Sequence, residues 1–207
     1  MAENERREVI LGADSGEQAR AILRRGRSVR LEPIGSDAHD FLYDFAIDEA
    51  VGWRWRHAGA VPRREVFEQS LWNGVLTQFV IVENASDTRI GMAVAYNADL
   101  NHGFAYVAAG VLGEAVGSGV AVEAIDMFVG HLFGCYRLRK LYFEVPEYNL
   151  EQFSSAIGSL LAPEALFSEH TYYNGRYWDR HVLTLDREVY AGIAGSSRVL
   201  GRQRRVR

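Results

Sequence analysis

The sequence predicts one α/β domain of the α+β type, with a mixed, mostly antiparallel sheet of about six to seven strands and about four flanking helices. Three observations support this prediction. The 207 residues, 48% of them apolar, suit a single hydrophobic core. Apolar segments at 78–83, 90–97 and 103–111 are joined by turns rich in Asn, Asp and Gly, which is typical of an antiparallel meander. Segments with helical periodicity precede and follow this meander.

The elements outside the meander follow from local signals. Ser36-Asp37 is an N-cap signal, Pro62 suits the first turn of a helix, and Asn174-Gly175 is a hairpin turn. The helix that begins at Val120 has an apolar face made of Val120, Ala124, Ile125, Phe128, Val129, Leu132 and Phe133. The predicted elements are a strand over 29–34, helices over 36–47, 62–73 and from 120, a strand over 140–145, a helix over 150–161, and strands over 165–172 and 177–185.

Three parts of the chain differ in pattern. Residues 1–27 are charged and weakly periodic, and they predict an N-terminal appendage with a short helix over 19–27. Residues 28–186 carry the strand and helix patterns of the folded domain. Residues 187–207 are rich in small and basic residues, which indicates a flexible basic C-terminal tail.

The composition favours a small molecule or another protein as the partner. A net charge of −4 gives no general attraction to nucleic acid or to an anionic membrane. The one cysteine, Cys135, cannot form an internal disulfide, and the polar N-terminus lacks a secretory signal. The most apolar segment, 116–136, contains Glu123, Asp126 and His131, which would be costly in lipid. We therefore expect a cytoplasmic protein with no nucleic-acid and no membrane partner.

A glycine-bearing loop, 113–119, joins the last meander strand to the following helix. The first backbone N–H groups of a helix lack intrahelical partners and attract phosphate, and glycines let the backbone approach it closely. A Walker loop is excluded, because Gly119 is followed by Val120-Ala121 rather than by Lys-Ser or Lys-Thr. A Rossmann fingerprint would follow the first strand of a parallel unit rather than a meander. The loop therefore indicates either a different phosphate ligand or a tight turn without one.

These features resemble the GNAT superfamily of acyltransferases, and within it the ribosomal-protein N-acetyltransferases of the RimJ/RimL type. Gly117 and Gly119 match the coenzyme A loop of that superfamily, Arg/Gln-x-x-Gly-x-Gly/Ala. Asn149, in Glu-Val-Pro-Glu-Tyr-Asn, lies where the RimJ/RimL branch has an Asn before its fourth helix. Segment 164–179 is similar to the final hairpin of that branch, and the matches together cover about 29–185.

The resemblance implies a sheet splayed to bind an acyl-CoA, either acetyl-CoA or another acyl-CoA, and it implies no metal ion. The pantetheine arm would pair with the backbone near 107–111, and the pyrophosphate would bind the loop at 112–120. The implied cofactor-binding residues are Val107, Val111, Leu112, Val116, Gly117, Ser118, Gly119, Val120 and Asn149.

Two positions depart from the family pattern. Glu114 stands where Arg or Gln usually begins the coenzyme A loop, and a carboxylate there repels a pyrophosphate unless it turns to solvent. Ala156 stands where many relatives have a tyrosine as general acid. The proton donor for the departing thiolate is therefore unassigned, although a thiolate, with a pKa of about 8.5, needs a proton less than an alkoxide does.

The resemblance also indicates candidate catalytic residues. Tyr106 lies on the strand where some relatives have a catalytic glutamate, and it would relay a proton. His102 lies just before that strand, titrates near neutral pH and is the alternative. A purely structural role, as a packed ring for Tyr106 or a solvated one for His102, stays open.

The loop between the first two helices, 51–62, lies where such folds shape the acceptor pocket. Its candidate substrate-binding residues are Trp53, Arg54 and Trp55. Aromatic walls with guanidinium groups would suit an acceptor that carries a carboxylate or phosphate. The alternative is that the two tryptophans cover the core.

The implied function is an acyl-CoA-dependent N-acyltransferase, and more specifically an N-acetyltransferase, in which an amine attacks the thioester directly in a ternary complex. The acceptor would be a small-molecule amine or a protein N-terminus, and relatives suggest a homodimer. One alternative is acyl transfer or decarboxylation with an acyl carrier protein on the same fold. Another is a non-catalytic module that binds CoA or a partner.

Overall fold

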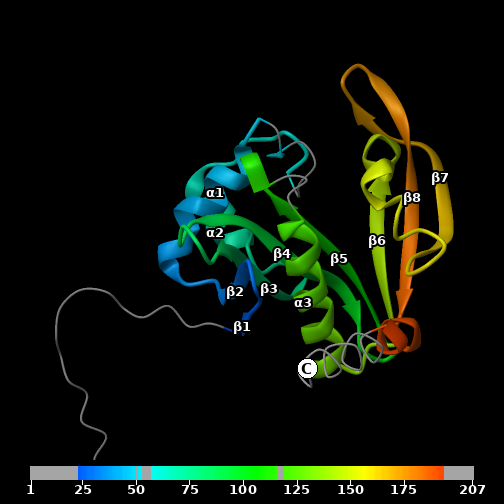
Figure 1. The fold of residues 1–207 in the computed structure, drawn as a ribbon. Helices are drawn as coiled ribbons and strands as arrows, with labels where there is room; N and C mark the ends of the chain where they lie inside the picture. The colour runs from blue at the N-terminus through cyan, green and yellow to red at the C-terminus, as the bar shows by residue number, and fades with distance from the viewer. Residues whose placement is uncertain (1–22, 50, 53–56, 116–118, 194–207) are drawn as a thin grey trace, which may run out of the picture.

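The computed structural model describes residues 23–193 except 50, 53–56 and 116–118 (Figure 1). In this part of the chain, eight strands form one sheet in the order β1-β2-β3-β4-β5-β6-β8-β7. All neighbouring strands are antiparallel except β5 and β6, which are parallel. The strands are β1 Arg24–Arg25, β2 Val29–Pro33, β3 Val75–Glu83, β4 Arg89–Asp99, β5 Phe104–Val111, β6 Lys140–Pro146, β7 Ala162–Tyr173 and β8 Arg176–Asp186.

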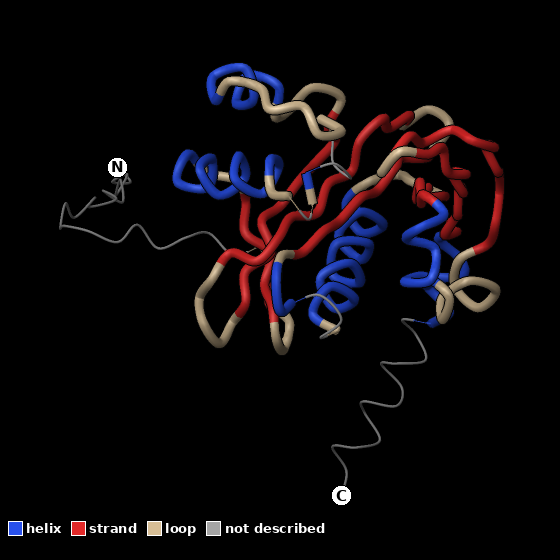
Figure 2. Tube along the Cα trace, turned by 90° about the horizontal axis from the view of Figure 1, so that it is seen from above, coloured by secondary structure: helices blue, strands red, loops and turns tan. Residues whose placement is uncertain are grey.

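Helices cover both faces of the sheet. Viewed from above, α1 and α2 lie over one face and α3 lies against the other (Figure 2). Two separate hydrophobic cores result, one on each face of the sheet, as expected for a sheet that helices cover on both sides. The helical elements are η1 Ser36–Ala38, α1 His39–Ile47, α2 Arg64–Ser70, η3 Gly113–Ala115, α3 Val120–Cys135 and η4 Glu147–Phe153, and residues 187–193 are also helical.

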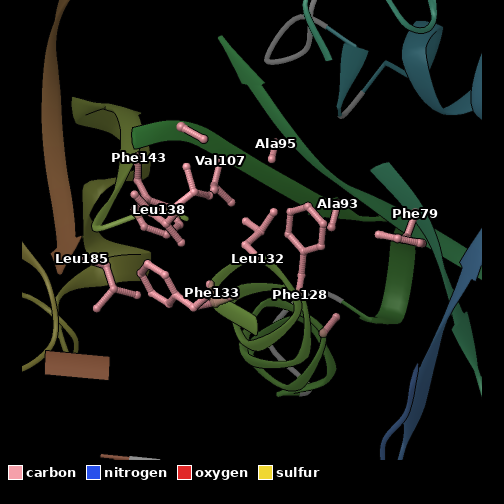
Figure 3. Close-up of a cluster of buried hydrophobic side chains, with 14 of the residues drawn as sticks. Phe79, Ala93, Ala95, Val107, Phe128, Leu132, Phe133, Leu138, Phe143 and Leu185 are labelled. Atoms are coloured by element: carbon pink, nitrogen blue, oxygen red, sulfur yellow. The ribbon is translucent and has the colours of Figure 1, made fainter. Parts of the chain in front are cut away.

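The larger core lies between α3 and the sheet. Phe128 and Leu132 point from α3 toward Ala93 and Val107 of the central strands, while Phe133 points toward Leu185 (Figure 3). The other four predicted members of the helix face are buried or packed against the same cluster, so the predicted apolar face is confirmed. The predicted meander and the hairpin at Asn174-Gly175 are also confirmed. None of the described helices is long and apolar enough to cross a membrane.

The sheet has one strand more than the upper end of the prediction. The additional strand is β1, which pairs with β2 where a helix was expected. Tertiary contacts override helix propensity here, because the carboxylate of Glu123 on α3 accepts hydrogen bonds from the backbone N–H groups of Arg27 and Ser28 in the β1–β2 turn.

The predicted helix over 150–161 is wrong. The 3₁₀ helix η4 ends at Phe153, and turns follow. Gly158 adopts a left-handed conformation (φ +83°) and its N–H donates to the carbonyl of Leu161 at 2.8 Å. A left-handed residue cannot continue a right-handed helix, so the chain reverses into β7 instead.

The ordered structure continues past Asp186. Residues 187–193 form a helix beside α3, in the region expected to be a flexible tail. Arg187 donates to the carbonyls of Phe133, Tyr136 and Leu138, and the hydroxyl of Tyr190 donates to the backbone carbonyl of Asp126 on α3 at 3.1 Å.

Candidate functional site

The parallel pair β5 and β6 separates part-way along its length. The pairing consists of Phe104↔Lys140, Ala105↔Leu141 and Tyr106↔Tyr142, after which the described strands have no further paired residues with each other. Each strand is held by its other neighbour: β5 pairs with β4 as far as Val111, and β6 pairs with β8 as far as Pro146. Figure 1 shows the two strands diverging. We call the region between 107–111 and 143–146 the β5/β6 fork.

The fork exposes backbone hydrogen-bonding groups of β5. The N–H of Leu112 donates to the carbonyl of Ile90 at 2.7 Å, which fixes the alternation along the antiparallel β4–β5 ladder. Because alternate residues of such a ladder bond to opposite sides, the N–H and C=O groups of Val107, Ala109 and Val111 point away from β4 and toward the fork. An extended ligand with amide groups can pair with a strand edge of this kind.

The loop after β5 leads directly to the N-terminus of α3. Gly119 is the N-cap residue and has φ +83° and ψ −11°, the left-handed conformation for which a glycine was expected. Among the described residues beyond its chain neighbours, a Cβ atom built on Gly119 meets no atom within 4 Å. Leu112 and Val120 are half-buried at the two ends of the loop, while Val116, Gly117 and Ser118 lie outside the described residues.

Tyr106 lies at the point where the strands separate. Ala105 and Val107 pack in the α3 core, so the alternation of β5 places the ring of Tyr106 on the opposite face, the α1/α2 face. Its ring centroid is 5.8 Å from that of Tyr96 on β4 and 5.1 Å from that of Tyr142 on β6. Burial, together with Glu144 and Tyr142, raises the pKa of Tyr106, so its hydroxyl stays protonated at neutral pH.

Glu144 extends this cluster on the same face of the sheet. Its Oε2 accepts a hydrogen bond from the Tyr96 hydroxyl at 3.1 Å, and its Oε1 is 3.5 Å from Nη1 of Arg180 on β8. Burial and the nearby Glu144 carboxylate raise the pKa of Tyr96 far above the ordinary value, so this phenol remains a donor. Arg180 is held in turn by Thr171 on β7, whose hydroxyl accepts from Nε at 3.1 Å.

Sequence reasoning missed Glu144, Tyr96 and Arg180. Glu144 belongs to the Glu-Val-Pro-Glu-Tyr-Asn segment used for the resemblance, but its partners come from β4 and β8, which lie far away in the sequence. Its position two residues after Tyr142 on an alternating strand was the available signal, since it places both side chains on one face.

His102 lies at the other end of β5. Its imidazole is exposed (side chain 74%) in the β4–β5 turn, and its Nδ1 is 2.8 Å from Oδ2 of Asp99. Hydrogen bonds from the backbone N–H and side chain of His102 lower the pKa of Asp99, so the pair forms a local turn motif. The structure does not bring His102 to the fork, because it precedes the paired segment that begins at Phe104.

The remaining predicted positions are only partly placed. Asn149 is half-buried in η4, which begins where β6 ends, on the open side of the fork. Ala156 lies in a turn and accepts hydrogen bonds from the N–H groups of Leu160 and Leu161, both at 2.8 Å. Trp53, Arg54 and Trp55 lie outside the described residues.

Comparisons with known proteins support a fold assignment. No family model matches the sequence, and no curated protein matches it. Among solved structures, a spermidine N-acetyltransferase from Vibrio cholerae in complex with CoA and spermine has a TM-score of 0.68 at 19% identity, covering 79% of this chain and 98% of that one. A dodecameric structure of the Vibrio cholerae enzyme in an intermediate state has a TM-score of 0.65 at 18% identity, covering 79% and 96%.

A third structure, spermidine/spermine N-acetyltransferase from Vibrio cholerae with manganese ions, has a TM-score of 0.64 at 18% identity, covering 80% of this chain and 96% of that one. In each of the three comparisons the likeness covers nearly the whole of the neighbour's chain. Their names give a polyamine acceptor, and none mentions a carrier protein. The sheet order, the β5/β6 fork and these likenesses agree: the chain has the GNAT acetyltransferase fold.

Proposed function

We propose that this protein is an acetyl-CoA-dependent N-acetyltransferase that acts on an amine. The observation that carries the proposal is the β5/β6 fork, where the backbone groups of Val107, Ala109 and Val111 face an unpaired strand edge that leads to the N-terminus of α3. The chemistry of coenzyme A fits both parts. Its extended pantetheine arm carries amides that can pair with a strand edge, and its pyrophosphate suits a helix N-terminus opened by a left-handed glycine.

The co-substrate supplies an activated acetyl group as a thioester. The chain's own residues then have two tasks at the fork: to orient the amine and to remove its proton. An alkylamine with a pKa near 10 is only about one part in a thousand neutral at pH 7, so deprotonation is needed before attack. Tyr106 is the last residue of β5 that pairs with β6, and its ring lies on the α1/α2 face. There it is suited to orient the amine or to relay its proton.

The acceptor that fits best is a small-molecule amine, and a protein N-terminus is the second candidate. The structural neighbours support the first, since they are named as polyamine acetyltransferases and one contains spermine. Aromatic rings at the fork, from Tyr96, Tyr106 and Tyr142, can also attract an ammonium group through cation–π contacts. A dodecameric neighbour leads us to propose that this chain assembles into a homo-oligomer as well.

The test is binding followed by turnover. Isothermal titration of the purified full chain with acetyl-CoA should give a micromolar dissociation constant. Mass spectrometry should then detect an acetylated product from spermidine, tyramine or a peptide with a free N-terminus. No binding at millimolar acetyl-CoA, or binding without product from any of these amines, would overturn the proposal.

A further inference from the structure

Three strands contribute to one polar group at the fork. Tyr96 on β4, Glu144 on β6 and Arg180 on β8 are joined by the contacts at 3.1 Å and 3.5 Å described above. The Tyr96–Glu144 bond spans β5, which lies between their strands in the sheet. Glu144 is the first residue of β6 past Tyr142 to return to the α1/α2 face, so its carboxylate lies just past the point where the strands separate.

We propose that Glu144 is the catalytic base that removes the proton from the acceptor amine, and that Tyr96 and Arg180 are positioning residues that hold its carboxylate. This inference rests on the proposed N-acetyltransferase function and adds the residue that performs its proton transfer. Tyr106 lies across the fork on β5, where some relatives have a glutamate. In this chain, the carboxylate comes from the neighbouring strand instead.

The surroundings of Glu144 suit this role. The groups that face it are Tyr96 from β4, Tyr106 from β5, Tyr142 from its own strand and Arg180 from β8. Three of these are tyrosines, and the Tyr96 hydroxyl donates to Oε2 of Glu144. The fourth is a guanidinium whose Nη1 is 3.5 Å from Oε1, so a donor and a cation hold the carboxylate in place. Its side chain is 29% exposed, which leaves room for an amine to reach it.

The proposed step balances as follows. An ammonium proton passes to the Glu144 carboxylate and leaves a neutral amine. The nitrogen lone pair then forms a C–N bond to the thioester carbon, the C–S bond breaks, and its electron pair leaves on sulfur. The second nitrogen proton goes to the thiolate, and the proton on Glu144 returns to water. The products are the N-acetylated amine, free thiol and one released proton.

The test is the pH dependence of turnover in Glu144→Gln, measured with whichever of spermidine, tyramine and the peptide the wild type acetylates fastest. With the base present, kcat/KM should be flat between about pH 6.5 and 8.5, because the ionised base binds the abundant ammonium form. In Glu144→Gln, kcat/KM should be at least about 100-fold lower at pH 7 and should rise about tenfold per pH unit, because only the rare neutral amine reacts. The acetyl-CoA dissociation constant should not change.

Glu164→Gln is the matched control. Glu164 also pairs with a cation at the sheet, Lys140 Nζ at 2.7 Å, but its position on β7 is outside the fork, so the flat profile should remain. Glu144→Asp keeps a carboxylate and should keep the flat profile at a reduced rate, which provides a readout if Glu144→Gln fails to fold.

The outcomes separate the two proposals. Wild-type protein that forms no product overturns the N-acetyltransferase function itself. Wild-type protein that turns over, with a Glu144→Gln variant within about threefold of its rate, overturns only the role of Glu144. The role of Glu144 is also overturned if kcat/KM of the wild type, or of Glu144→Asp, already rises about tenfold per pH unit.

Discussion

The hydroxyl of Tyr96 donates a hydrogen bond to the carboxylate of Glu144 at 3.1 Å, across the intervening strand β5. This contact ties β4 to β6 on the face opposite α3, at the position where β5 and β6 separate. Because burial and the carboxylate raise the pKa of Tyr96, the phenol does not lose its proton as the pH rises through its ordinary value near 10. The phenol therefore keeps the proton with which it donates to Glu144.

Removing the Tyr96 hydroxyl should leave the Glu144 carboxylate less firmly positioned without changing the binding of acetyl-CoA. We expect Tyr96→Phe to lower kcat about five- to tenfold while the dissociation constant of acetyl-CoA stays within about twofold. Tyr43→Phe is the control, since the Tyr43 hydroxyl also makes one hydrogen bond, to the carbonyl of Pro62 at 2.9 Å, but lies between α1 and α2. Equal kinetics for the wild type and Tyr96→Phe would show that this contact is structural only.

Tyr106 should matter through its hydroxyl rather than its ring. We expect Tyr106→Phe to lower turnover at least about tenfold without unfolding the protein, since the phenyl ring keeps the contacts to Tyr96 and Tyr142. Steady-state kinetics with circular dichroism measures both effects. His102→Ala discriminates between the two sequence-derived candidates: exposed and away from the fork, His102 should be replaceable within about twofold, and a larger loss there than in Tyr106→Phe would reverse the assignment.

Gly119 allows a comparison in which backbone strain is held constant. Gly119 and Gly175 have φ of +83° and +81°, and a Cβ atom built on either meets no atom of the described residues beyond its chain neighbours within 4 Å. Substitution by Glu should therefore introduce a similar backbone strain of about 1–2 kcal/mol at both positions. Only at Gly119 would the new carboxylate lie at the α3 N-terminus. Calorimetry should show acetyl-CoA affinity at least about tenfold lower for Gly119→Glu and unchanged for Gly175→Glu. Equal acetyl-CoA affinities for the two variants would show that the pyrophosphate does not bind at the N-terminus of α3.

Much of the fold was predictable because its signals are local. The α3 face repeats with helical periodicity, and the meander turns carry the residues that turns require, as at Asn174-Gly175. The failures involve contacts between distant segments. β1 forms because Glu123 of α3 binds its turn, and the helix over 150–161 is replaced because Gly158 takes a left-handed conformation that a sequence allows but does not require.

The candidate site was predictable along single strands but not between them. Val107 and Tyr106 follow from position on β5, where the fork begins, and Gly119 follows from the loop that leads from β5 to α3. Glu144 needs the knowledge that β6 lies next to β5 with Tyr142 opposite Tyr106. That register depends on the whole sheet, because β6 is fixed by β8 from the end of the domain.

Core truncation should show the importance of the α3 core. Phe128 is fully buried and stacks edge-to-face on Phe79 with 5.9 Å between ring centroids. Denaturant unfolding of Phe128→Ala should show a loss of about 3–5 kcal/mol, because the side chain leaves a cavity between α3 and the sheet. Val122→Ala on the same helix changes a side chain that is 71% exposed, so its loss should stay within about 0.5 kcal/mol. Similar losses for both variants would contradict this account of the core.

Arg187 should be as important to the fold as a core residue, although it follows the last strand. Its guanidinium donates to the carbonyls of Phe133 and Leu138 at 2.5 Å and of Tyr136 at 2.6 Å, and so satisfies acceptors at and after the end of α3. Arg187→Ala should lower the free energy of unfolding by about 2–4 kcal/mol, since three partly buried carbonyls lose a charged donor. Arg187→Lys should recover only part of this stability, because one ammonium group cannot reproduce the planar set of N–H donors of a guanidinium.

Two further variants decide whether this region belongs to the domain. Glu188→Ala changes an exposed neighbour and should leave stability unchanged. A chain that ends after Asp186 loses Arg187 together with Tyr190, whose ring packs on Phe133 at 5.6 Å, so it should unfold at lower denaturant concentration than a chain that ends after Ile193. If both truncated chains unfolded at the same concentration, residues 187–193 would be dispensable and the folded domain would end with β8.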